Sequence, residues 1–282
     1  MIESLFQFEF LQNAFITGII IGIIAPLLGV FIVVRKLALI ADALSHVTLS
    51  GIAASLLISK WWVPFAAVNP LYTGMLFSVV GALLIEKLRT VYKHYEELAI
   101  PIIMSFGVGL GVIFISLANG FTTDLFGYLF GSVSAVSRTD LYIVIIISVI
   151  VIITITAIYK ELFVLSFDEE HGQSLGLPAK LIHFIFIVTV ALVIAISMRI
   201  VGILLVSALM TLPVAASIRL AKSFKQAIIY SILFGELSVI GGLISAYYLD
   251  LAPGGTIVVI AAGILLVTIL YKKLRLNFKI VG

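Results

Sequence analysis

Apolar runs of about twenty residues recur along the whole chain, and they constrain the fold more than any other feature of the sequence. A membrane-spanning helix needs about 17–25 predominantly apolar residues. Nine such runs can be drawn along the chain. The sixth and seventh are separated by barely a turn, so eight crossings are the alternative to nine. We therefore expect an all-α integral membrane protein, a polytopic bundle of eight to nine transmembrane helices in a single domain over residues 1–282. The nine runs lie at residues 11–34, 37–59, 70–86, 98–118, 141–159, 181–198, 200–218, 226–249 and 254–271.

The Lys and Arg residues indicate which way the chain crosses the membrane, because the positive-inside rule places them in cytoplasmic segments. With the amino terminus outside, 14 of the 17 basic residues fall in inner segments, and only Lys60, Arg138 and Arg199 fall outside. The carboxyl terminus is then cytoplasmic. The first ten residues carry two glutamates and no basic residue, so they lack the basic region of a signal peptide. We expect them to remain as a short interfacial helix.

Two absences from the sequence narrow the chemistry. The chain has no cysteine, so any metal ligands must be nitrogen and oxygen atoms. It also has no GxxxxGK[ST] motif, which excludes ATP binding in the P-loop manner. The basic residues are spread over the inner segments in the way that topology requires, and they predict no nucleic-acid surface.

The segment LALIADALSHVTLSGIA, residues 37–53, places Asp42 and His46 inside the second apolar run. At about 1.5 Å per residue, Asp42 lies about 8 Å and His46 about 14 Å from the cytoplasmic entry of the helix. Their i, i+4 spacing puts both side chains on one face, which Ser50 extends by a turn. Ionisable groups at this depth are costly and normally face an interior cavity, and this pair suits a divalent first-row metal. A structural pair that ties two helices together is the alternative.

Glu236 is a second carboxylate at membrane depth, about ten residues into the eighth run. Its depth of about 15 Å matches that of His46. If the second and eighth runs are neighbours, Asp42, His46 and Glu236 would form a nitrogen and oxygen site suited to zinc or manganese. A protonated glutamate that bonds to backbone or faces a dimer seam is the alternative.

The loop SFDEEHGQSLGLP, residues 166–178, belongs to the inner segment at about 160–180 and carries its own helix signals. Ser166 followed by Glu169 predicts a capping box, and Gly176 predicts a C-terminal stop. We expect a short helix at about 167–175 on the cytoplasmic face, with an ordinary amphipathic connector as the alternative. The residues expected to form its contacts with a partner or with water are Phe167, Asp168, Glu169, Glu170 and Gly176.

Several segments accompany the D-x-x-S-H core at residues 42–46 in a characteristic order. They are LRTVYK (88–93), YLFGS (128–132), SFDEE (166–170), VGILLVSALMTLPVAA (201–216) and AYYLDLAPGGTIV (246–258). In order and spacing they resemble the permeases of the zinc/manganese class of ABC transporters. The sequence HVTLSG is more similar to the zinc-uptake branch, because the manganese branch commonly has a proline before the glycine.

The resemblance implies a homodimer in the bacterial cell membrane, paired with two cytoplasmic ATP-hydrolysing subunits and supplied by an extracellular metal-binding lipoprotein. It implies that Asp42 and His46 coordinate the transported ion, that the helix near 167–176 couples to the ATPase, and that no cofactor is bound permanently. We expect the permease subunit of a zinc importer, without an ATPase site of its own. A manganese importer of the same family, an ABC permease for a siderophore or cobalamin, and a proton-coupled secondary metal transporter are the alternatives.

Overall fold

The computed structural model describes residues 8–92, 94–118, 120 and 123–281, and every regular element among them is a helix. Of the ten residues predicted to form an interfacial helix at the amino terminus, residues 1–7 lie outside the described residues, and Glu9 and Phe10 belong to the first long helix. The elements are α2 (Glu9–Val34), α3 (Leu39–Trp61), η1 (Val63–Ala67), α4 (Pro70–Val91), η2 (Glu96–Leu98), α5 (Ala99–Leu117), α6 (Thr123–Phe130), α7 (Arg138–Ala157), α8 (Tyr159–Phe167), α9 (Glu169–Ser174), α10 (Ala179–Val201), α11 (Ile203–Leu220), α12 (Phe224–Leu249) and α13 (Pro253–Val281).

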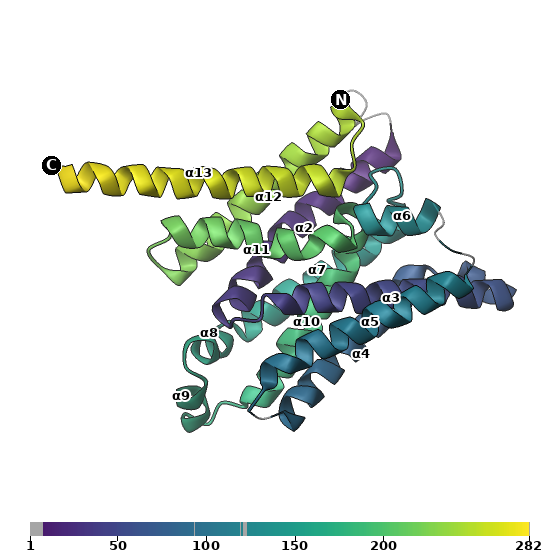
Figure 1. Ribbon diagram of the computed structural model, residues 1–282, viewed down its shortest axis with the longest axis horizontal. Helices are drawn as coiled ribbons and strands as arrows, with labels where there is room; N and C mark the ends of the chain where they lie inside the picture. The colour runs from purple at the N-terminus through teal and green to yellow at the C-terminus, as the bar shows by residue number, and fades with distance from the viewer. Residues whose placement is uncertain (1–7, 93, 119, 121–122, 282) are drawn as a thin grey trace.

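Eight of these helices are long and apolar enough to cross a membrane: α2, α3, α4, α5, α7, α10, α12 and α13. The shorter α11 packs along α2, α12 and α13, and Figure 1 shows it running beside α13. Eight spans together with this ninth, shorter helix confirm the predicted all-α bundle of eight to nine transmembrane helices. The predicted runs match these helices to within a few residues at most ends, whereas α6 was not predicted.

The break between α10 and α11 is a single residue, Gly202, with φ 83° and ψ 152°. Only glycine adopts this backbone conformation readily, and the Leu129 carbonyl leaves no space for a side chain there. The chain therefore reverses sharply between two helices. This explains why the sequence from 181 to 218 shows almost no polar turn.

Contacts between helix ends show which ends lie together at each side of the bundle. We name these two sides the outer end and the inner end, after the orientation that the Lys and Arg residues predict. At the outer end the Ser132 N–H donates to the Arg199 carbonyl at 3.0 Å, and Gly254 packs against the Val201 carbonyl. At the inner end the segment between α2 and α3 meets α4 and α8, where Arg35 and Arg89 line one cavity. In Figure 1, α6 lies at the outer end and α8 and α9 at the inner end.

The core of the bundle is formed mainly by α2, α3 and α10. In their most apolar windows 67%, 72% and 72% of the residues are buried, against 28% in α13 and 33% in α7. Close helix contact depends on small residues: Gly29 of α2 packs directly against the Met210 carbonyl of α11. The peripheral helices leave large apolar side chains exposed, as expected where they face lipid.

Candidate functional site

The candidate metal ligands Asp42 and His46 lie near the inner end of α3, about 5 Å and 10 Å along the helix from Leu39. Between residues 40 and 50 of α3, every residue is buried except Asp42, His46 and Leu49, which are partly exposed. These positions share one stripe of the helix. The pair therefore occupies the side of α3 that this chain's own core does not cover.

Within the part of the chain that the structure describes, neither Asp42 nor His46 forms a hydrogen bond or an ion pair with another residue. Their polar neighbours are satisfied within α3 itself. Ser45 donates to the Ala41 carbonyl at 2.7 Å, and Ser50 donates to the Val47 carbonyl at 2.7 Å. The carboxylate and the imidazole thus remain available as ligands. The alternative, a structural pair tying two helices together, finds no partner among the described residues.

Glu236 lies in another part of the bundle, because α12 packs against α2, α11 and α13 and not extensively against α3. Its Oε1 atom is buried without a hydrogen-bond partner and points at Gly22 of α2, where a side chain would collide with it. Among the described residues, no three or more His, Asp and Glu side chains come close enough to hold a metal ion. The three-residue grouping is not formed within one chain, and the role of Glu236 as a ligand stays a prediction.

The helix predicted over 167–175 is shorter than expected and begins differently. Its N-cap is Asp168, whose Oδ1 accepts the His171 N–H at 2.8 Å, and α9 covers Glu169–Ser174. Ser166 does not cap it, because α8 continues to Phe167 and the Ser166 hydroxyl donates to the Leu162 carbonyl at 2.6 Å. The predicted stop is present, since Gly176 has φ 81° directly after the helix.

An aromatic cluster joins this segment to the bundle. Phe167 is 62% exposed, yet its ring lies 5.0 Å from that of Phe163 and 5.7 Å from that of Phe224 at the start of α12. The Phe31 ring of α2 lies 5.1 Å from the same Phe224 ring. Packed rings therefore connect the end of α8 to α2 and to the start of α12.

A charged network closes the inner end beside the same segment. The Nε2 atom of His183 on α10 lies 2.8 Å from the Glu86 carboxylate of α4, and Arg89 pairs with Glu96 at 2.7 Å. Arg35 lines a cavity of about 310 Å³ with Arg89, Phe167 and Glu169. Burial lowers the pKa of the Arg35 guanidinium, and the negative charge of Glu169 opposes that shift. Because an arginine remains charged, the cavity keeps a cation beside the exposed end of α8.

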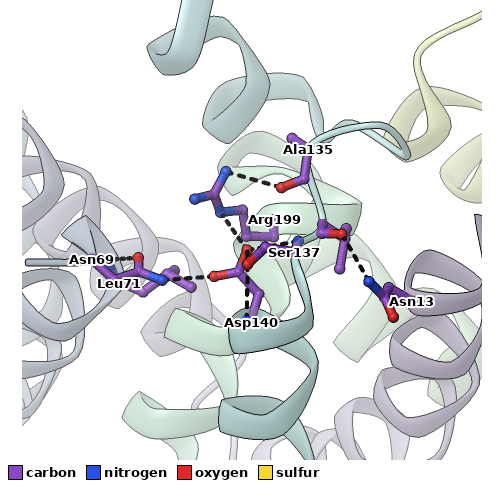
Figure 2. Close-up of polar contacts among 8 residues, drawn as sticks. Asn13, Asn69, Leu71, Ala135, Ser137, Asp140 and Arg199 are labelled. Atoms are coloured by element: carbon purple, nitrogen blue, oxygen red, sulfur yellow. Dashed lines mark hydrogen bonds and ion pairs between the residues drawn. The ribbon is translucent and has the colours of Figure 1, made fainter. Parts of the chain in front are cut away.

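A second polar network at the outer end was not predicted from the sequence (Figure 2). Asp140, which is 1% exposed, accepts from Asn69 at 2.8 Å and from the Ser137 hydroxyl at 2.8 Å. Arg199 lies 3.5 Å from the same carboxylate and donates to the Ala135 carbonyl at 3.3 Å. The network joins α4, α7 and α10. Its sequence signal was Ser137 three residues before Asp140, a capping-box pattern ahead of an apolar run.

A polytopic helical bundle with an unsatisfied carboxylate and imidazole at membrane depth is the architecture of a membrane transport protein. The family model of the ABC 3 transport family matches residues 7–272 of the chain. The chain therefore belongs to the ABC 3 transport family and is a membrane permease.

Relatives align over nearly the whole chain. The "Probable metal transport system membrane protein" of Treponema pallidum is 34% identical over 263 residues, which cover 93% of this chain and 96% of that protein. The "Manganese transport system membrane protein MntC" of Listeria monocytogenes is 34% identical over 270 residues, covering 96% and 93%. The "Manganese import system permease protein ScaB" of Streptococcus gordonii is 33% identical, covering 95% and 93%.

A solved structure gives the same result for the fold. A chain of "PsaBC from Streptococcus pneumoniae in complex with Fab" superposes with a TM-score of 0.81 at 33% identity, covering 95% of this chain and 93% of that chain. The resemblance to ABC metal permeases is confirmed. Of the relatives described above, the two whose names specify a metal specify manganese, so they favour the manganese alternative over the zinc expectation.

Proposed function

We propose that this chain is the permease subunit of an ATP-driven importer of divalent metal ions, with manganese as the main cargo. Family membership supports the ABC class, and the names of the relatives support the metal. Carboxylate and imidazole ligands also suit manganese, since hard oxygen donors hold this ion well. The zinc expectation rested on the sequence before a single glycine, which is weaker support than the names of two relatives that align over nearly the whole chain.

One observation carries the proposal: the stripe of Asp42 and His46 near the inner end of α3 is partly exposed, and neither residue has a structural partner among the described residues. Exposing Asp42 and His46 to hydrocarbon would cost about 2.5–3.5 kcal/mol per charged group even on the lenient insertion scale. A second copy of the chain that packs against this stripe removes the cost. By twofold symmetry it supplies the same residues, so that two carboxylates and two imidazoles face one pathway.

The pair is suited to passage of the ion and not to its storage. An ion held by a closed shell of protein ligands is released slowly, whereas a pathway needs sites that bind and release. A carboxylate and an imidazole from each copy leave coordination positions for water. Movement of the helices then changes the distance between the two copies' ligands and releases the ion toward the inner end.

Two further partners follow from the proposal. A pair of cytoplasmic ATP-binding subunits docks on α9 and on the exposed Phe167, where the aromatic cluster transmits movement to α2 and α12. An extracellular metal-binding lipoprotein delivers the ion at the outer end. The amino terminus is then outside and the carboxyl terminus in the cytoplasm of a bacterial cell.

The test is manganese and zinc uptake by the whole complex in proteoliposomes. We expect His46→Ala and Asp42→Asn each to lower manganese uptake at least tenfold, because each removes a ligand from both copies. Basal ATP hydrolysis should persist, since the ATPase lies in another subunit. The matched control is Ser50→Ala, whose hydroxyl is buried and donates to its own helix. Uptake unchanged in both ligand variants would contradict the proposal.

Glu236 is tested separately by Glu236→Gln, which removes the charge and keeps the shape beside Gly22. If Glu236 is a ligand in the dimer, manganese uptake falls as it does in the α3 variants. Unchanged uptake assigns Glu236 to packing between α12 and α2 and leaves the role of the α3 pair standing.

A further inference from the structure

Charged residues at the inner end are divided into two regions of different character. Residues 35–38, 86–98 and 159–180 hold seven Lys and Arg together with seven Asp and Glu. Residues 219–226 and 271–282 hold seven Lys and Arg and no Asp or Glu. The positive-inside rule requires enough basic residues in inner segments, but it does not require that one region be neutral and the other wholly basic.

The side chains of the basic region are exposed wherever the structure describes them, at Arg219, Lys222, Lys225, Lys272 and Lys273. None of these five forms an ion pair with a described residue. In the neutral region, by contrast, Arg89 pairs with Glu96 and Glu86. These five basic side chains are therefore uncompensated among the described residues.

The helix register places the two basic segments at one depth. Gly254 of α13 lies against Val201 and Leu205, so α11 and α13 start side by side and run in the same direction along one another. Both helices advance about 1.5 Å per residue, so the residues near 271–273 lie level with the end of α11 near Leu220. Figure 1 shows α13 continuing beyond that end.

This depth coincides with the lipid headgroups. The 29 residues of α13 span about 44 Å, whereas the hydrocarbon core is about 30 Å thick. The last turns therefore extend past the hydrocarbon, and Tyr271 stands immediately before the basic residues at the position of an interfacial aromatic.

We propose that the inner end of α11–α13, the segments 219–226 and 271–274, binds the headgroups of anionic phospholipids in the inner leaflet. Uncompensated Lys and Arg at headgroup depth attract anionic lipid, and α13 is the least buried spanning helix, so lipid reaches it from the side. A protein partner fits the neutral region better, because its mixed charges and the exposed α8–α9 segment offer both signs and an apolar contact.

The test uses the purified complex in nanodiscs with spin-labelled phosphatidylglycerol or phosphatidylcholine, and it measures the fraction of immobilised lipid. We expect a preference for phosphatidylglycerol of about fivefold or more, since one Lys or Arg near an anionic surface changes binding by about that factor. The preference should be lost in K225Q/K272Q/K273Q and in 1 M salt, where the screening length falls to about 3 Å.

The matched control K87Q/K160Q/K180Q removes three exposed lysines from the neutral region and should keep the preference. The charge-preserving K225R/K272R/K273R should keep it as well. Since the chain has no cysteine, a single cysteine placed at Ser174 reports whether each variant keeps its orientation. Equal loss in both lysine-to-glutamine variants, or no preference in the wild type, overturns the proposal. Retained lipid preference with loss of the ATP-binding subunit from K225Q/K272Q/K273Q would assign the surface to a protein partner instead.

Discussion

Replacing Asp140 by alanine should destabilise the permease more than any change to an exposed charge. The buried carboxylate accepts from Asn69 at 2.8 Å and from the Ser137 N–H at 3.1 Å and hydroxyl at 2.8 Å. It also lies 3.5 Å from Arg199, whose Nε atom is buried without another hydrogen-bond partner. Asp140→Ala therefore leaves a cation and an amide unsatisfied at the junction of α4, α7 and α10.

The size of the effect follows from these contacts. Removing one partner of a buried ion pair costs about 3–5 kcal/mol, and the lower value applies because the Arg199 side chain is 21% exposed. Loss of the reciprocal cap at the start of α7 adds about 1 kcal/mol. The sum of about 4 kcal/mol, at about 2–4 °C per kcal/mol for a chain of this size, predicts a fall in Tm of about 8–16 °C.

The assay is thermal denaturation of purified permease in detergent, followed by the folded fraction on size exclusion. The matched control is Glu97→Ala, which removes an equal charge from an exposed residue that has no ion pair among the described residues. Arg199→Gln should couple to Asp140→Ala, so that the Tm of the double variant falls by less than the sum of the falls in the two single variants. A Tm for Asp140→Ala within 2 °C of that of Glu97→Ala would refute the reasoning.

Three other outcomes are expected. Gly29→Ala should lower the Tm by several degrees, because the new methyl group overlaps a backbone carbonyl of α11; Gly263→Ala, which meets nothing within 4 Å, should leave it unchanged or slightly higher. Asp168→Ala should speed hydrogen exchange of the first amides of α9 by about fivefold for a cap of about 1 kcal/mol, whereas Ser166→Ala should not change it. Arg89→Gln should lower the Tm by a few degrees at low salt, since it breaks pairs linking α4 to the segment before α5, and high salt should reduce the difference.

The spans were predictable from the sequence because burial in lipid imposes length and hydropathy on each helix separately. The shared face of Asp42 and His46 was predictable for the same reason, since it depends on one helix alone. Whether Glu236 lies beside Asp42 and His46 could not be predicted from the sequence. The depth of a residue fixes its position along the membrane normal but not its position around the bundle. Only the packing of α12 against α2 shows that Glu236 meets Gly22.

The cap of α9 shows a different limit. Ser166 has a glutamate three positions later, as in a capping box, and Asp168 is itself a preferred N-cap residue, so local signals permit either start. The structure selects Asp168 because α8 runs on to Phe167, whose ring packs on Phe163 and Phe224. Long-range packing decided between two local solutions that the sequence leaves nearly equal.

Satisfaction of hydrogen bonds separates the structural polar groups of this bundle from its functional ones. Asp140 and Arg199 are held by neighbours from three helices, and their loss should cost stability. Asp42 and His46 lie on an uncovered stripe of α3 and have no partner among the described residues, so their replacement should cost little stability and much transport. Polar groups in lipid are expensive whether or not they are satisfied, and a chain that leaves two of them open on one helix face must gain their partners from outside the chain. A second copy and a passing ion are partners that meet this requirement together.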